Sequence, residues 1–491
     1  MSALPLPAAQ HGAHAFAQVA WTVCQAEWRA LRRSSVAVTA AVLLVVLTLA
    51  ATLVSWDQMR AVDAERAHLQ READEQWNAQ PDRHPHRVVH YGHYIFRPLS
   101  PLAFFDFGVD PYTGHTLYLE GHRQNSANFS DAGQSSVLLR FGQLTPAFVV
   151  QTLSPLVIAF LAFGSVARER ERGQLRLLIA QGLPGGALLA GKLASHAVVA
   201  LLLAGPALAA LAVIAIADPA VRAHAAWMMA GYAAYVVIWA LAAVLVSAAT
   251  PRARDALLAL VGCWIVTVIL LPRAMPDLAA AQVPRPTRIE TEVAIHQELA
   301  ALGDSHNPDD PHFKEFRRRI LAKYGVGRVE DLPVNYGGLL IEEGERLTSA
   351  LFVRHMHEEF ERQRQQAAIV AAAQFISPVL ALRGLSNALA GTDRASHEHF
   401  LLEGEAYRYR MIQALNGLHV SEVRYQGDRD QRISKSLFQR VPRFAHEPIG
   451  LATVVERHVS PALAVFALWL AVLVGGAWWL ARRLERGALS R

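Results

Sequence analysis

The sequence contains few cysteines and few charged residues, and both shortages narrow the class of protein. Its 491 residues include two cysteines, Cys24 near the start and Cys263 inside an apolar run, so neither long polar segment can hold a disulfide of its own. Charged residues make up 18% of the chain and hydrophobic residues 53%. This balance is too apolar for a soluble globular enzyme and predicts a membrane protein.

The placement of the basic residues argues against nucleic-acid binding. The formal net charge is +5, but arginines bracket the apolar runs instead of gathering with aromatic residues on one polar face. Arginines in such places are typical of cytoplasmic loops, which retain positive charge during membrane insertion. We therefore expect the lipid bilayer, and no nucleic acid, as a partner.

Six apolar runs without Asp, Glu, Lys or Arg are long enough to cross a bilayer. A hydrocarbon core about 30 Å thick needs roughly 20 apolar residues in a helix, because lipid offers no partner to an unpaired backbone group. The first run is longer than the core of a signal peptide, so we expect it to remain as an anchor. The runs are residues 36–54, 144–167, 193–217, 225–249, 256–272 and 460–481. The predicted fold class is an all-α polytopic membrane protein with six transmembrane helices.

The short connections between the runs predict the orientation. Arginines and one lysine at 29–33, 168–192, 252–254 and 482–486 all fall on one side if each run crosses once. By the positive-inside rule this side is the cytoplasm, so both termini are cytoplasmic and the chain lies in the bacterial inner membrane. Residues 1–35 predict an amphipathic helix along the inner leaflet, with an ordinary frayed leader as the alternative, and residues 482–491 form a cytoplasmic tail.

Two large segments, residues 55–143 and 273–459, are left outside the cytoplasm, and both are expected to be mainly helical. Residues 56–79 contain no Gly or Pro, so the first span should continue outward as one helix. In the second segment, residues 288–302 and 311–324 alternate apolar and charged residues at helical spacing. Residues 393–416 predict a further helix with Asp393 as its N-cap.

Histidines are concentrated in these two segments, which hold 17 of the 21. Four of them, His84, His86, His90 and His93, are candidate metal ligands, because imidazoles at i and i+2 or i and i+4 can share an ion. No cysteine or carboxylate stands beside them at a firm spacing, and a solvated histidine-rich surface is the better interpretation. The sequence contains no HExxH motif, which argues against a metalloprotease.

The connection at residues 168–192 is the most informative short segment. Glu169, Arg170, Glu171 and Arg172 predict one mixed-charge helical turn, and Gly173 should interrupt it. The leucines that follow predict a short amphipathic helix that could dock into a cleft of a soluble partner and carry motion into the spans. A positive-inside loop without a partner is the alternative. The residues assigned to this coupling are Glu169, Arg170, Glu171, Arg172, Gly173, Leu175 and Leu178.

This segment resembles the coupling loop of ABC-2-type permeases, in which an ERE-G-TL-LLL pattern precedes a Gly-Lys pair. The pair here is Gly191 and Lys192, and Gln174 stands where Thr is usual. The resemblance implies a permease subunit that pairs with a second permease, identical or homologous, and with a separate ATP-binding subunit. ATP and magnesium would be bound by that partner, so no cofactor and no catalytic residue are expected in this chain.

Further stretches resemble one branch of the family, the permease component of multicopper-enzyme-maturation ABC systems, such as those of nitrous-oxide reductase. They are SPLAFFDFGVDPYTG, EGHRQNSANF, RFGQLTPAFVVQTLSPL and ISPVLALRGLSNALAGTDRASHEHF. The resemblance does not identify a cargo. A membrane scaffold or maturation factor that transmits ATP-driven motion to an extracytoplasmic client protein is therefore the alternative function.

Two other functions are excluded by missing side chains. The stretch 186–193, GALLAGKL, nearly fits a phosphate-binding loop, but Leu193 replaces the hydroxyl residue that would bind magnesium and no strand precedes it. An intramembrane enzyme is excluded as well, because none of the six runs carries a charged residue for chemistry.

Overall fold

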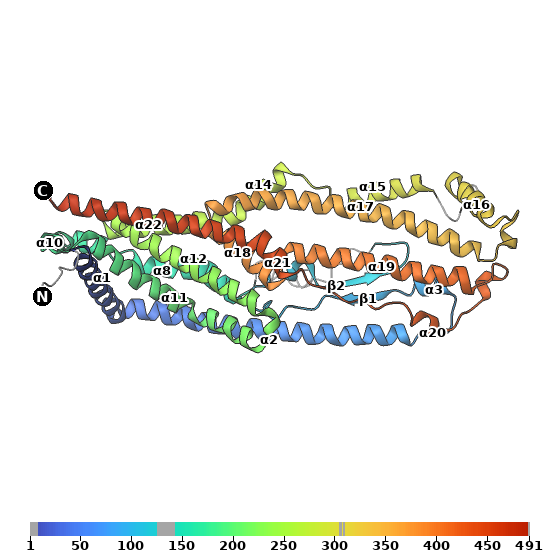
Figure 1. The fold of residues 1–491 in the computed structure, drawn as a ribbon, viewed down its shortest axis with the longest axis horizontal. Coiled ribbons are helices and arrows are strands. Elements are labelled where there is room, and N and C mark those ends of the chain that lie inside the picture. Colours follow the sequence, from blue (N-terminus) through green and yellow to red (C-terminus); the bar gives the residue numbers. More distant parts are fainter. Residues whose placement is uncertain (1–7, 125–142, 304–306, 308–309, 490–491) are drawn as a thin grey trace, which may run out of the picture.

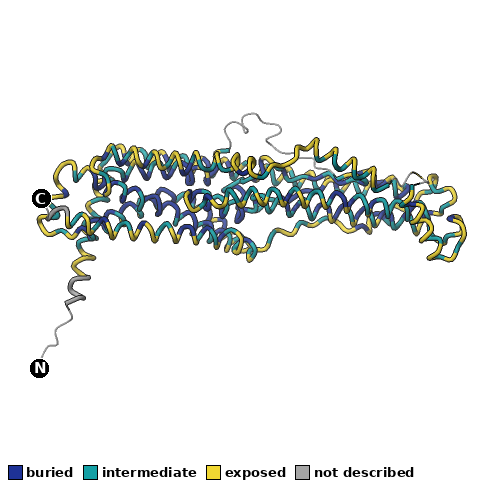
Figure 2. The backbone as a smooth tube through the Cα atoms, turned by 90° about the horizontal axis from the view of Figure 1, so that it is seen from above, coloured by how far each residue is buried: buried dark blue, intermediate teal, exposed yellow. Residues whose placement is uncertain are grey.

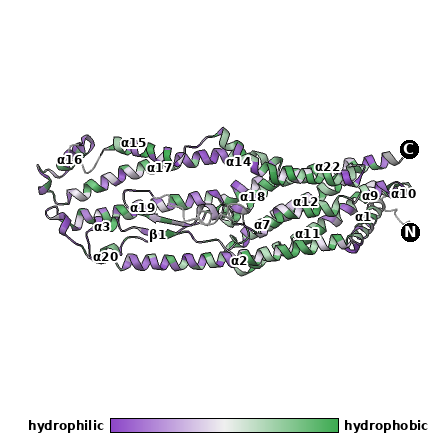
Figure 3. Cartoon of the chain, turned by 180° about the vertical axis from the view of Figure 1, so that it is seen from behind, coloured by the Kyte–Doolittle hydropathy of each residue, from purple (hydrophilic) through white to green (hydrophobic). Residues whose placement is uncertain are grey.

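The protein is an elongated bundle whose helices run along one axis (Figure 1). The computed structural model describes residues 8–124, 143–303, 307 and 310–489, and it is 78% helical. Hydrophobic residues gather over one half of the molecule and hydrophilic residues over the other, as Figure 3 shows. Residues 125–142, which include parts of two stretches quoted above, lie outside the described residues.

Six described helical stretches are long and apolar enough to cross a membrane, which confirms the predicted number and fold class. We refer to the half of the molecule that they form as the apolar bundle. The stretches are Ser35–Asn78, Pro146–Glu171, Gly185–Ala217, Pro219–Ala249, Ala253–Gln282 and Leu451–Arg486. The described residues begin and end at the same end of this bundle (Figure 1).

The first of these stretches is α2 (Ser35–Asn78), which runs from the apolar bundle far into the polar half. Its 44 residues span about 66 Å at 1.5 Å per residue. The hydroxyl of Ser34 caps its start by accepting a hydrogen bond from the backbone N–H of Ala37 at 3.3 Å. The absence of Gly and Pro after the apolar run is the reason that the helix continues, as the sequence predicted.

Three stretches of the bundle contain a π-helical turn that ends two residues before a proline. A proline has no N–H to donate to the preceding turn, and its ring crowds a carbonyl there, so a wider turn accommodates it without ending the helix. The fifth stretch therefore continues as α14 (Leu271–Gln282), beyond the predicted end at residue 272. The turns are Val149–Leu153, Ile265–Leu270 and Val455–Val459, and the prolines are Pro155, Pro272 and Pro461.

Side chains of neighbouring helices satisfy carbonyls in these turns. The hydroxyl of Tyr235, on α12 (Arg222–Ala249), donates to the carbonyl oxygen of Gln151 at 2.8 Å. The hydroxyl of Ser377 donates to the carbonyl oxygen of Thr267 at 2.5 Å. Because an unpaired carbonyl is costly inside a membrane, these hydrogen bonds make the proline-containing turns tolerable there.

The polar half is built mainly from antiparallel helices. Its main helices are α15 (Arg288–Leu302), α16 (Pro311–Tyr324), α17 (Tyr336–Ala372) and α19 (Arg394–Glu422). The first two have the predicted bounds. The shorter α18 (Pro378–Ala390) lies at the junction of the two halves and packs against α12 of the apolar bundle. α19 passes the predicted end at residue 416, because residues beyond it are buried and His419 Nε2 lies 2.7 Å from a carboxylate oxygen of Asp428.

A small lobe from the first polar segment packs against α19. It consists of α3 (Pro85–Val89) and an antiparallel hairpin of β1 (His93–Phe96) and β2 (Thr116–Leu119), with His93 opposite Leu119. Ile95 and Leu117 of the hairpin are buried against Phe400 and Met411 of α19. Buried residues run through the interior of both halves, as Figure 2 shows, so the polar half has a hydrophobic core of its own.

Candidate functional site

The connection that the sequence singles out forms two short helices at the end of the bundle where the described residues begin and end. They are α9 (Ala167–Glu171) and α10 (Gln174–Ala180), and we refer to residues 167–180 as the elbow. Gly173 joins them with a φ of +73°, a left-handed conformation in which a side chain is strained. The sequence pattern of a charged turn, a glycine and a leucine-rich helix is thus confirmed in structure.

Two charged residues of α9 cap the ends of neighbouring helices. The Arg170 guanidinium donates to the carbonyl oxygen of Ala248 at 2.6 Å and to that of Thr250, at the C-terminus of α12. A carboxylate oxygen of Glu171 accepts from the backbone N–H of Ala253 at 3.0 Å, where α13 (Ala253–Trp264) begins. A cation at a helix C-terminus and an anion at an N-terminus are the stabilising arrangement, so α9 is fixed to both helices.

A third link is made by Lys192, near the start of α11 (Gly185–Ala217). Its side chain is 1% exposed, and its ammonium donates to Glu27 at 2.7 Å, to the carbonyl oxygen of Ser165 at 2.7 Å and to Glu169 at 2.8 Å. An ammonium has three donors, and all three are used. His196, one turn further on, is buried, and its Nε2 lies 3.9 Å from Glu27.

The two faces of α10 differ. Leu175 is buried in the bundle core and Leu178 is half-buried, so neither offers its full side chain to a partner. Leu177 is 60% exposed, and Arg172 and Arg176 beside it are exposed as well. We refer to Arg172, Arg176 and Leu177 as the outer face of the elbow. The charged residues of α9 thus hold the elbow in place, whereas the outer face remains available for contact.

The N-terminal helix α1 (Ala8–Arg33) lies directly on α11, as its contacts at Gly191 show. A Cβ atom at Gly191 would lie 2.4 Å from the carbonyl oxygen of Ala20 and 2.7 Å from the Cβ of Val23. Only glycine allows this close approach. The Gly-Lys pair of the sequence therefore has two roles, since Gly191 admits α1 and Lys192 binds its Glu27.

Sequence reasoning missed Glu27, the α1 partner of Lys192. An isolated glutamate in an amphipathic helix has no distinguishing spacing, and its partner Lys192 stands 165 positions away. The unpaired lysine at the start of a transmembrane run was the available signal, because a buried ammonium requires carboxylate partners.

A second group of buried polar residues lies where the apolar bundle meets the polar half. Asp106 accepts from the hydroxyl of Ser386 at 2.7 Å and from the amide of Gln151 at 3.2 Å. That amide also donates to the hydroxyl of Tyr232 at 2.7 Å. Burial raises the pKa of Asp106, although these hydrogen bonds act against the rise. Asp106, Gln151 and Ser386 come from three different stretches of the sequence resemblance, which the fold brings together here.

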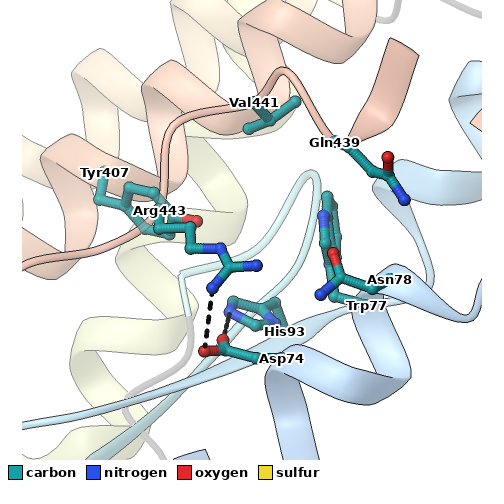
Figure 4. A pocket seen from close by; sticks show the side chains of 8 residues that line it. All are labelled: Asp74, Trp77, Asn78, His93, Tyr407, Gln439, Val441 and Arg443. Atoms are coloured by element: carbon teal, nitrogen blue, oxygen red, sulfur yellow. Dashed lines mark ion pairs between the residues drawn. The ribbon is translucent and has the colours of Figure 1, made fainter. Parts of the chain in front are cut away.

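The four candidate metal-binding histidines do not form one site. His86 and His90 lie together, with their Nε2 atoms 3.2 Å apart. His84 is buried, and its Nε2 lies 3.2 Å from Asp428. Figure 4 shows that His93 stands instead beside Asp74, at 3.8 Å, with Arg443 on the same carboxylate. The short separations along the chain were misleading, because α3 and the turn after it send these side chains in different directions.

Two family models match this chain. Residues 21–311 match the family model described as ABC-2 family transporter protein, which is more than half of the chain and includes Glu27, the elbow and Lys192. Residues 288–447 match a domain of unknown function, DUF3526, which contains most of the helices of the polar half. No curated protein matches the sequence.

Proposed function

The chain belongs to the ABC-2 transporter family, and from that premise we propose that the outer face of its elbow is the surface on which the ATP-binding subunit docks. Membership makes the chain a multi-pass membrane subunit of an ABC transporter, and the family implies an ABC ATP-binding subunit as its partner. In this proposal the partner binds ATP and magnesium, and the chain itself performs no catalysis.

The observation that carries the proposal is that the charged residues of α9 bind the bundle while the outer face of the elbow stays exposed. Glu169, Arg170 and Glu171 bind three different helices of the bundle, at Lys192, at the end of α12 and at the start of α13. A displacement of the elbow should therefore move three helices with it, because these hydrogen bonds and ion pairs fix it to each of them. Contiguous contacts of this kind can couple a docking surface to distant helices.

The outer face has the composition of a docking surface. It presents Leu177 at 60% exposure together with two exposed arginines, Arg172 and Arg176. An exposed leucine can insert into an apolar pocket, and arginines are enriched at protein interfaces, where they pair with carboxylates. We therefore expect a cleft in the ATP-binding subunit with an apolar floor and an acidic rim.

The orientation follows from the same proposal. If the elbow faces the cytoplasm, both ends of the chain lie there too, and the polar half lies outside the inner membrane. A second permease subunit, identical or homologous, would complete the transporter. Exposed apolar residues on α2, Val42, Leu43, Val46 and Leu53 among them, would contact that subunit or lipid.

The test is whether docking depends on the outer face. We expect the double variant Arg176→Glu, Leu177→Glu to bind the ATP-binding subunit at least about tenfold more weakly, because loss of an interface anchor costs about 2 kcal/mol or more. Co-purification and the ATPase rate of the complex in lipid measure this. The matched control is Arg432→Glu, Ile289→Glu, two exposed positions in the polar half. Wild-type assembly and ATPase rates in the elbow variant would refute the proposal.

A second candidate function is the transmission of motion to an extracytoplasmic client protein. It is favoured by α2, which continues without a break from the apolar bundle into the polar half. A continuous helix can carry a displacement along its axis. Insertion of two glycines at Ala67 in the polar part of α2 should then abolish activation of the client but leave assembly with the ATP-binding subunit unchanged.

A further inference from the structure

Three histidines of the first polar segment converge at one point of the polar half. They are His86 in α3, His90 at the end of α3, and His122 in the turn after β2. Each offers one ring nitrogen, and the three nitrogens all lie within 4.8 Å of one another. The Nε2 atoms of His86 and His90 are 3.2 Å apart.

The backbone is shaped to bring the third histidine to the other two. The backbone N–H of Gly121 donates to the carbonyl oxygen of Val89 at 3.1 Å, which holds the turn against the end of α3. A Cβ atom at Gly121 would lie 2.1 Å from Val89, so the approach requires glycine. His122 itself has a φ of +63°, and among the described residues it is the one non-glycine residue with a positive φ. Such strain persists where the surroundings enforce it, often at a functional position.

A buried carboxylate orients the third ring. The backbone N–H of His122 donates to Glu345 at 3.1 Å, and its Nδ1 lies 3.2 Å from the same oxygen. The carboxylate of Glu345 is fully buried, and its other oxygen accepts from Arg408 at 2.6 Å. With Nδ1 directed at Glu345, the Nε2 of His122 is the atom left for a ligand. A carboxylate behind a ligating histidine fixes the tautomer and the ring orientation of metal-binding histidines.

We propose that His86, His90 and His122 bind one divalent cation of the kind that prefers imidazole, with Glu345 as the residue that positions His122. Three imidazoles and one open position are a known zinc arrangement, so Zn²⁺ is the ion that fits the donor set best. Copper(II) and nickel(II) share the preference for imidazole. Hard ions such as calcium and magnesium prefer oxygen ligands and should not bind.

The neighbouring group of His84, His419 and Asp428 has a different explanation. One oxygen of Asp428 accepts from His419 at 2.7 Å, from His84 at 3.2 Å and from the amide of Asn335 at 3.0 Å. This carboxylate already has its hydrogen bonds, and both rings point an N–H at it. The group therefore acts as a hydrogen-bonded link between distant segments, and it serves as an internal control for the metal site.

The proposed ion would join parts of the chain that share no disulfide. The two cysteines, Cys24 and Cys263, lie in α1 and α13 of the other half. The ion would instead bind α3 to the turn after β2, and Glu345 would continue the link to α17. Metal binding should therefore raise the thermal stability of the polar half, as for any ligand that binds the folded state.

The experiment uses the full-length protein purified in lipid nanodiscs and stripped with a chelator. We expect one equivalent of Zn²⁺ per chain by calorimetry, with a higher unfolding midpoint after addition, and tetrahedral absorption bands when Co²⁺ replaces it. His90→Asn, at an exposed position, should weaken Zn²⁺ binding at least tenfold and abolish the Co²⁺ bands. The controls are His357→Asn, at another exposed histidine, and His419→Asn, in the hydrogen-bonded group around Asp428, and both should bind as the wild type does.

Each other outcome refutes a defined part of the proposal. Zn²⁺ binding that His90→Asn leaves intact, or that His419→Asn removes, would overturn the assignment of the ligands. Absence of stoichiometric binding in the wild type would overturn the site itself. Glu345→Gln should weaken binding by about 10- to 100-fold if Glu345 positions His122, and wild-type affinity would refute that role. The general affinity series of divalent metals sets how tightly Cu²⁺ and Ni²⁺ should bind relative to Zn²⁺. If either ion binds more tightly than this series predicts, that ion and not Zn²⁺ is the native one.

Discussion

The ammonium of Lys192 lies 2.8 Å from the carboxylate of Glu169, so the elbow is tied directly to the start of α11. The same ammonium lies 2.7 Å from Glu27 of α1. One buried lysine thus joins three segments, and this explains why a lysine stands at the start of an otherwise apolar helix. It also gives Glu169 an internal partner, which makes its direct contact with another subunit unnecessary.

Lys192→Met should destabilise the protein strongly. It leaves Glu27 and Glu169 without a cation, and breaking a buried pair by removing one partner costs about 3 to 5 kcal/mol. Both carboxylates are partly exposed, so we expect the free energy of unfolding to fall by about 3 kcal/mol, measured by reversible unfolding in lipid. The additional change Glu27→Gln should restore part of the stability, whereas Lys435→Met, at an exposed lysine, should change little. A wild-type midpoint for Lys192→Met would contradict this role.

Gly191→Ala should displace α1 from α11. The new Cβ would lie 2.4 Å from the carbonyl oxygen of Ala20, and backbone cannot move aside as a side chain can. Overpacking of this kind typically costs about 1 to 3 kcal/mol. The matched control is Gly186→Ala on the same helix, where the nearest atom is 3.4 Å away on the ring of Phe16. A disulfide crosslink between α1 and α11, formed in the control and lost in Gly191→Ala, measures the displacement.

Gly173→Ala should destabilise the elbow without any steric clash. Nothing lies within 4 Å of its Cβ position, so the cost is that of the left-handed backbone alone, about 1 to 2 kcal/mol. Gly384→Ala tests the opposite sign, because Gly384 lies inside α18 with equally open space and an ordinary helical backbone. That change should be neutral or stabilising by up to about 1 kcal/mol. Equal effects of the two substitutions on the unfolding midpoint would refute the argument from backbone conformation.

The polar half should lose stability as the pH falls from about 6.5 to 4. Burial, together with the nearby Arg97 charge, lowers the pKa of both His115 and His397 to about 4. In this pH range the unfolded chain takes up protons at these two rings and the folded protein does not. Acid therefore favours unfolding. Asp110 acts in the opposite sense, because burial raises its pKa to about 6 despite Arg97.

His397→Gln should make the unfolding midpoint less dependent on pH over this range, because one of the two rings is removed. Unfolding monitored at pH 7.5, 6.5, 5.5 and 4.5 measures the slope. His68→Gln, at an exposed histidine of α2, is the control and should keep the wild-type slope. A slope that His397→Gln leaves unchanged would show that this ring does not contribute.

Accessibility of engineered thiols tests the orientation. In a variant with Cys24→Ser and Cys263→Ala, a membrane-impermeant maleimide added to intact spheroplasts should label Ser436→Cys, in the polar half, and spare Gln181→Cys, at the end of the elbow. Both positions are exposed in the structure, so a difference in labelling reports the side of the membrane. The reverse pattern would place the elbow outside and exclude docking of a cytoplasmic ATP-binding subunit.

The sequence by itself determined the six membrane-spanning helices, the long continuation of α2 and the bounds of α15 and α16. Each of these depends on local composition: apolar length, the absence of Gly and Pro, and capping or breaking residues that act over a few positions. It also determined the layout of the elbow, because a glycine between a charged turn and a leucine-rich turn acts locally. The ends of helices were less certain, since π-helical turns carry the chain through Pro272 and tertiary contacts extend α19 past residue 416.

Only the tertiary structure decided which residues meet. Glu27 reaches Lys192 from 165 positions away, and Glu345 reaches His122 from 223 positions away, so no spacing in the sequence indicates either pair. It also separated residues that the sequence had grouped, since His84 lies beside Asp428 and His93 beside Asp74 instead of joining His86 and His90. Leu175 likewise faces the bundle core. The physical reason is that ion pairs and metal sites depend on distance in space, which the packing of helices far apart in the chain sets.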